Sequence, residues 1–115
     1  MSKEKELPAA ASNLANAHPE VWNAYAGLGK SVAEAGPLEG ETLRLVKLAL
    51  AIGASREGAV HSHVRRGLRE GISPDALSHV ALLAIPTLGL SQAVQALTWI
   101  SDITGDRSKR SPSDG

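Results

Sequence analysis

Apolar residues recur at helical spacing through most of the chain, and no segment of useful length alternates as a β-strand does. The first clear run begins at Pro19, a residue that suits the first position of a helix, and Gly36-Pro37 ends it. A second run, residues 39–52, is apolar over most of its circumference, which predicts burial on several sides. The pattern therefore predicts an all-α fold.

Three more helices are predicted from their start and stop signals. A hydroxyl side chain in front of each apolar run suits an N-cap, and proline or glycine marks the breaks between them. The predicted helices begin at Ser55, Ser73 and Ser91 and end near Gly71, Ile85 and Ile103, with Pro86 and Gly89 separating the last two. The whole chain reads as a bundle of about five to six helices.

The composition leaves little material for a hydrophobic core. Phenylalanine is absent, and the only aromatic residues are Trp22, Tyr25 and Trp99. Small aliphatic side chains bury little area each, and a chain of 115 residues forms one domain at most. Disulfides cannot compensate, because there is no cysteine. We therefore expect a homo-oligomer, in which contacts between subunits supply the missing burial.

The charge balance and the chain ends define the remaining expectations. Twelve basic residues match twelve acidic ones, so no electrostatic argument favours nucleic acid or an anionic membrane as partner. The charged N-terminus is not a signal peptide, and no apolar run approaches membrane-spanning length, so we expect a cytoplasmic protein. We expect residues 1–17 to be a partly disordered segment, 18–104 the domain, and 105–115 a disordered tail.

The candidate chemistry is concentrated in residues 57–67, where a carboxylate, two imidazoles and two guanidinium groups interrupt an aliphatic chain. On a helix, His61 and His63 point ~200° apart, so they cannot both bind one metal ion. Glu57, His61 and Arg65 follow one another at i, i+4 spacing along one edge. His63 falls instead with Ala59, Val60 and Gly67 on the apolar side, so we expect it to face inward.

Each of these residues has a structural and a chemical interpretation. His63 fits either a hydrogen-bonded core histidine or a general acid–base, because imidazole titrates near neutral pH. Glu57 fits a helix N-terminal charge or a catalytic acid. Arg65 and Arg66 fit a solvated face or a carboxylate-binding pair. Lys47, a charge inside the apolar second helix, either extends to solvent or pairs with Glu57 or a ligand carboxylate.

The order of these segments resembles that of the carboxymuconolactone decarboxylase family, in the same superfamily as the alkylhydroperoxidase AhpD. The likeness covers about residues 18–104. The matching segments are Gly36-Pro-Leu-Glu, the apolar helix from Leu43, the stretch Glu57-Gly-Ala-Val-His-Ser-His-Val-Arg-Arg-Gly-Leu, and Gly71-Ile-Ser-Pro-Asp-Ala-Leu. The resemblance implies an all-α fold with a central helical hairpin, assembled as a trimer or hexamer.

The chain departs from the peroxidase branch of that superfamily. The resemblance implies a Cys-x-x-Cys pair at the positions of Arg56 and Ala59, and a relay glutamate at the position of Arg44. With both thiols missing, peroxide reduction through a disulfide is excluded. His63 matches the histidine that both branches share.

Three functional hypotheses follow. The first is a cofactor-independent enzyme acting on a small carboxylate or lactone, with His63 as general acid–base, Glu57 orienting His61, and Lys47, Arg65 and Arg66 as anion-binding groups. The second is a non-catalytic helical oligomer, a binding or scaffold module that retains the fold. The third is a metal-dependent site built from Glu57 and histidines of different helices or subunits. The first needs neither a metal nor an organic cofactor.

Overall fold

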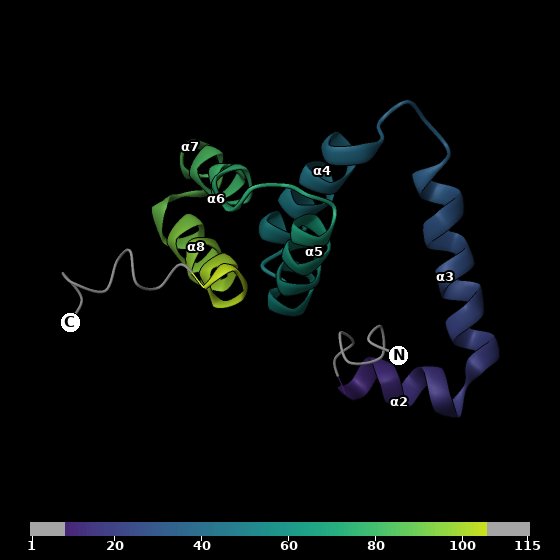
Figure 1. Ribbon diagram of the computed structural model, residues 1–115. Coiled ribbons are helices and arrows are strands. Elements are labelled where there is room, and N and C mark those ends of the chain that lie inside the picture. The colour runs from purple at the N-terminus through teal and green to yellow at the C-terminus, as the bar shows by residue number, and fades with distance from the viewer. Residues whose placement is uncertain (1–8, 106–115) are drawn as a thin grey trace. The chain divides into compact units, whose positions relative to one another are not determined.

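The computed structural model describes residues 9–105, and every regular element in that range is helical (Figure 1). The all-α prediction is therefore confirmed. None of the described helices combines the length and apolar character that crossing a membrane would need. The helices are α2 (Ala9–Ala17), α3 (Pro19–Ala33), α4 (Gly40–Gly53), α5 (Glu57–Arg69), α6 (Pro74–Leu83), α7 (Ile85–Leu88) and α8 (Leu90–Thr104).

The chain divides into two compact units between Leu38 and Glu39. The described part of the first unit contains helices α2 and α3, and neither helix contains a buried residue. Helix α2 was not predicted, since residues 9–17 were expected to belong to a partly disordered N-terminal segment. Residues 1–8 and 106–115, the outer parts of the segments expected to be disordered, lie outside the described range. Trp22 and Tyr25 contact each other on α3 with ring centroids 5.8 Å apart.

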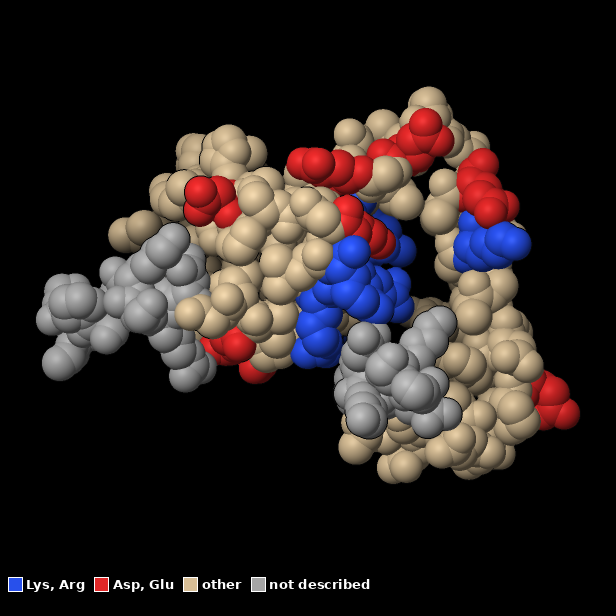
Figure 2. Space-filling model, viewed as in Figure 1, with Lys and Arg blue, Asp and Glu red and all other residues tan. Residues whose placement is uncertain are grey.

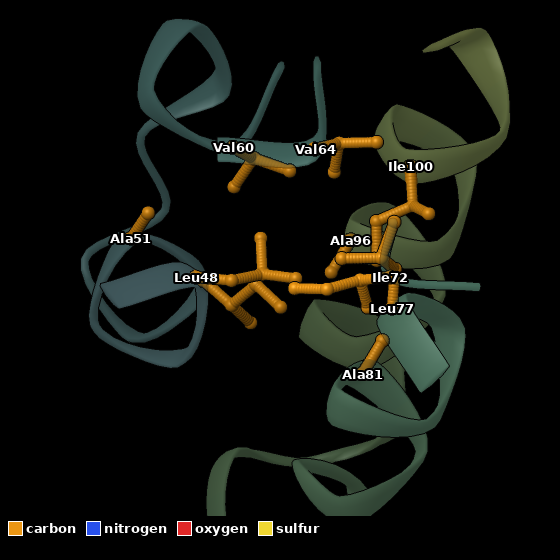
Figure 3. Close-up of a cluster of buried hydrophobic side chains, with 10 residues drawn as sticks. Leu48, Ala51, Val60, Val64, Ile72, Leu77, Ala81, Ala96 and Ile100 are labelled. Carbon is orange, nitrogen blue, oxygen red and sulfur yellow. The ribbon is translucent and has the colours of Figure 1, made fainter. Parts of the chain in front are cut away.

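The second unit contains the hydrophobic core. Helices α4 and α5 form a hairpin joined by residues 54–56, and α6 and α8 pack against it (Figure 1). Figure 3 shows Leu48 from α4, together with Val60 and Val64 from α5, pointing toward side chains of α6, α8 and the segment before α6. The core residues are Leu48, Ala51, Ile52, Val60, Val64, Ile72, Leu77, Ala81, Ala96 and Ile100.

The helix starts follow the predicted signals only in part. Ser73 caps α6 as predicted, since its hydroxyl accepts a 3.0 Å hydrogen bond from the amide of Ala76. Ser55 is not the cap of α5. It adopts a left-handed conformation with φ 54°, and its hydroxyl lies 2.9 Å from the side-chain amide nitrogen of Gln92. Ser91 is not a cap either, because α8 begins at Leu90 with Gly89, at φ 99°, before it.

Gly67 is the point of closest approach between α5 and its neighbours. A Cβ atom at this position would lie 3.0 Å from Leu77 Cδ2 and 3.6 Å from Arg44 Cγ. Because Leu77 is fully buried, it has little room to give way. The missing side chain therefore lets α5 pack directly against α6 and against the base of the Arg44 side chain.

Candidate functional site

The two imidazoles of α5 lie on opposite flanks of its buried stripe. The stripe consists of Val60, Val64 and Gly67. His63 contacts α4 on one flank, and His61 contacts α8 on the other. The predicted opposition of the two rings is thus confirmed, but His63 is only partly buried and lies beside the apolar stripe instead of facing the core.

Arg44 of α4 is the direct partner of His63. Its Nη1 donates a 2.9 Å hydrogen bond to His63 Nδ1. Its Nε and Nη2 donate to the two carboxylate oxygens of Glu70, at 3.0 and 2.9 Å. This bidentate geometry fixes the guanidinium plane, and the Arg44 side chain is only 12% exposed. One arginine therefore joins the middle and the end of α5 to α4.

The electrostatic surroundings of His63 disfavour its protonated form. Burial is the largest cause, followed by the positive charges of Arg44, Lys47 and Arg66, and together they lower the pKa of His63 to about 4. Glu70 opposes this shift more weakly. At neutral pH the His63 imidazole is therefore uncharged. Figure 2 shows Lys and Arg side chains gathered over α4 and α5.

The hydrogen bond from Arg44 also selects the tautomer of His63. A guanidinium has donors only, so Nδ1 must present its lone pair and the single ring proton of the neutral form lies on Nε2. Arg44, Lys47, His63, Arg66 and Glu70 are called the His63 cluster below. It combines three cationic side chains, one carboxylate and a neutral imidazole that offers an N–H donor.

The opposite flank of α5 carries an acidic cluster. His61 Nε2 lies 3.1 Å from Asp102 Oδ2 of α8, and the two side chains are 20% and 23% exposed. Glu57, one helical turn before His61, is exposed and completes a group whose ligand-type atoms lie within 4.8 Å of one another. Glu57, His61 and Asp102 are called the His61 cluster below.

The structure divides the residues that the sequence nominated. Lys47 and Arg66 lie near enough to act on His63, whereas Glu57 and His61 belong to the other flank. Among the interactions resolved for residues 9–105, Arg65 takes part in neither cluster. Three cluster members were not nominated as site residues, and they are Arg44, Glu70 and Asp102.

The sequence contained a signal for two of the residues that were not nominated, Glu70 and Asp102. Glu70 directly follows α5, and Asp102 lies in the last turn of α8. A carboxylate at a helix C-terminus opposes the helix dipole, so it suggests a compensating partner from elsewhere. For Glu70 that partner is Arg44, whose hydrogen bonds are the largest cause of the lowered pKa of Glu70. Arg44 itself occupied the position that the resemblance assigns to a relay acid.

Comparison with family models matches residues 19–102 to the carboxymuconolactone decarboxylase family. The matched range contains every member of both clusters, and Asp102 is its last residue. No curated protein and no solved structure matches the chain.

Proposed function

The chain belongs to the carboxymuconolactone decarboxylase family, and from that premise we propose that it is a cofactor-independent enzyme. Its substrate is a small carboxylate or lactone, bound at the His63 cluster. The observation that carries the proposal is the excess of positive charge around a neutral, half-buried imidazole. An anion is the ligand that such a site attracts.

The charges of the cluster support carboxylate binding. Arg44, Lys47 and Arg66 contribute three positive charges, and Glu70 offsets one of them. Arg44 is committed to Glu70 and His63 through three hydrogen bonds, which leaves Lys47 and Arg66 as the cations best placed to hold a ligand. The Nε2–H of His63 supplies a neutral donor to the same anion.

The proposed chemistry is decarboxylation of a conjugated lactone acid. The bond between carbon and the departing carboxylate breaks, carbon dioxide leaves, and the electron pair delocalises into the lactone. A cation near the oxygen that gathers this charge stabilises the transition state. Arg44 releases its hydrogen bond to Nδ1 of His63, which takes up the second ring proton. A proton then returns to carbon from Nε2 of this protonated His63, and solvent restores the proton on the imidazole.

The state of His63 depends on the ligand in this scheme. In the free protein the pKa of His63 is too low for an imidazolium at neutral pH. A bound carboxylate adds negative charge beside the ring and offsets Lys47 and Arg66, so it raises the pKa of His63. Substrate binding thereby prepares the acid that the last step requires.

We also propose that the protein acts as a homo-oligomer, a trimer or a hexamer as the family resemblance implies. On α3 the side chains of Val21, Tyr25, Leu28 and Val32 repeat at helical spacing and are 55–66% exposed. A helix with such a stripe and no buried residue gains stability by packing against another apolar surface. A second copy of this chain would provide that surface.

The binding experiment uses the purified full chain. Small mono- and dicarboxylates and carboxylated unsaturated lactones are titrated while the ring resonances of His63 are followed by NMR, and release of carbon dioxide is measured in parallel. We expect saturable binding that weakens at least about tenfold in Lys47→Met, because a charge contact is lost. Arg65→Met, which removes a neighbouring cation outside the cluster, should bind as the parent does.

His63→Gln separates catalysis from binding. We expect turnover to fall by about 100-fold or more while assembly is unchanged, because general acid–base groups contribute effects of this size. Full turnover in His63→Gln would contradict the proposed role of His63. Equal binding by Lys47→Met and Arg65→Met would contradict the cationic site.

Assembly is tested separately by analytical ultracentrifugation. Leu28→Lys should shift the protein toward smaller species, since it places a charge within the exposed α3 stripe. Lys30→Ala, two residues away on the same helix, serves as the control. A monomeric parent protein would contradict the oligomer proposal.

A further inference from the structure

We propose that the His61 cluster binds a divalent transition-metal ion, with Zn²⁺ as the representative ion. Glu57, His61 and Asp102 each place one ligand-type atom within 4.8 Å of the others. They offer one imidazole nitrogen and carboxylate oxygens from two side chains, which are ordinary zinc ligands. This site lies on the opposite flank of α5 from the His63 cluster and is independent of the function proposed there.

Two packed helices hold the three ligands in place. Glu57 and His61 are four residues apart on α5, so their side chains project from the same side one turn apart. Asp102 comes from the last turn of α8. Val64 and Ile100 are fully buried core residues of the same two helices, which fixes the separation of the ligand-bearing segments.

The observed distances are close to those of a metal site. His61 Nε2 and Asp102 Oδ2 are 3.1 Å apart. Ligands bound tetrahedrally to zinc at about 2.0–2.2 Å are separated by about 3.3–3.6 Å, so an ion fits between these two atoms after a small adjustment. Glu57 is exposed, and rotation of its side chain closes the third contact.

The charge of the donor set favours a divalent ion. Two carboxylates and a neutral imidazole carry two negative charges, which a divalent cation balances. The imidazole favours zinc and related transition metals over Ca²⁺ and Mg²⁺, which prefer oxygen ligands alone. Because the three side chains are at least partly exposed, water supplies the fourth ligand.

The site differs from the metal site that the sequence suggested. That hypothesis combined Glu57 with histidines from different helices or subunits. Here Asp102 takes the place of a second histidine, and all three ligands come from one chain. The signal was the i, i+4 pair of Glu57 and His61, but sequence spacing alone did not connect it to α8.

The test uses tag-free full-length protein that has been freed of metal with a chelator. Zn²⁺ is titrated by calorimetry, and the bound metal is counted by elemental analysis after gel filtration. We expect one ion per chain and a rise in the unfolding temperature, by about 10 °C when free Zn²⁺ exceeds its dissociation constant 100-fold. Mg²⁺ at the same concentration should bind much more weakly.

Variants identify the ligands. His61→Ala and Asp102→Asn should each weaken Zn²⁺ binding more than about tenfold, and Glu57→Gln by a smaller factor because that side chain is exposed. His79→Ala, which removes an exposed imidazole on α6, is the control for non-specific histidine binding and should bind as the parent does.

Absence of saturable Zn²⁺ binding in the parent protein would overturn the proposal. Unchanged binding in both His61→Ala and Asp102→Asn would overturn it equally. If His61→Ala does not fold, as judged by circular dichroism, the near-isosteric Asp102→Asn decides the question by itself. None of these results bears on carboxylate binding at the His63 cluster.

Discussion

The two flanks of α5 carry the same ring in opposite electrostatic surroundings. His63 lies among Arg44, Lys47 and Arg66, whereas His61 lies near the carboxylates of Glu57 and Asp102. The imidazoles are only two positions apart along the chain, yet a buried stripe of Val60 and Val64 separates them in space. The comparison shows that the neighbouring helix decides the chemistry of each histidine. On one side that helix is α4, and on the other it is α8.

The largest predicted effect on stability comes from Gly67, a member of the buried stripe that lies between the two flanks. Gly67→Ala should lower the free energy of unfolding by about 1–3 kcal/mol, because its Cβ would lie 3.0 Å from fully buried Leu77. Urea denaturation measures the change. Gly58→Ala is the matched control on the same helix: its Cβ meets no atom within 4 Å, so it should raise stability by about 0.5–1 kcal/mol. Equal effects would contradict the tight contact at Gly67.

The next effect is a pH dependence that belongs to the His63 flank. The pKa of His63 is about 4 in the folded chain, whereas the ordinary histidine value of 6.5 applies to the unfolded chain. Between these pH values the unfolded chain binds more protons at His63 than the folded chain does. The contribution of neutral His63 to the free energy of unfolding is therefore complete above pH 6.5 and is lost as the pH falls toward 4. Allowing for the partial exposure of the ring, the loss should be about 1–2 kcal/mol.

Denaturation curves at several pH values test this dependence. His63→Gln should remove the part of the pH dependence that lies between pH 4 and 6.5, and His79→Gln corrects for the general effect of losing one imidazole. An unchanged slope in His63→Gln would show that other groups govern acid sensitivity.

Replacing Arg44 should make the electrostatic surroundings of His63 more like those of His61. Arg44→Met removes the nearest positive charge and the donor to Nδ1, so the pKa of His63 should rise by about one unit. It should stay below 6.5, because burial, the largest cause of the shift, remains. NMR titration of the ring protons measures the pKa directly. Arg65→Met should leave it in place, and a comparable rise in that variant would contradict the assignment of Arg44.

The smallest effect should come from the exposed partner of Arg44. Glu70→Gln should change the free energy of unfolding by only about 0.2–1 kcal/mol, because the Glu70 side chain is 45% exposed and surface ion pairs contribute little. The substitution should also lower the pKa of His63 slightly further, since Glu70 raises that pKa in the parent protein. A loss of several kcal/mol would mean that Glu70 positions the whole guanidinium group.

The sequence by itself determined the helical architecture and the local signals that depend on neighbouring residues. Helical spacing predicted the all-α fold and the opposed directions of His61 and His63, because a helix has a fixed angle per residue. The hydroxyl in front of an apolar run predicted the Ser73 cap. The order of motifs also indicated the family, which the match over residues 19–102 confirms. The cap predicted at Ser55 was wrong because this residue adopts a left-handed conformation and its hydroxyl contacts Gln92. The cap predicted at Ser91 was wrong because α8 begins at Leu90, directly after Gly89.

Only the tertiary structure decided which charges surround each histidine. Arg44 is 19 residues from His63 along the chain, and Asp102 is 41 residues from His61. Periodicity gives the direction of a side chain around its own helix, but it does not say which helix packs there or at what height. Packing around Leu48, Val64 and Ile100 sets those relations, so the division of one polar sequence segment into a cationic and an acidic cluster emerged only with the fold.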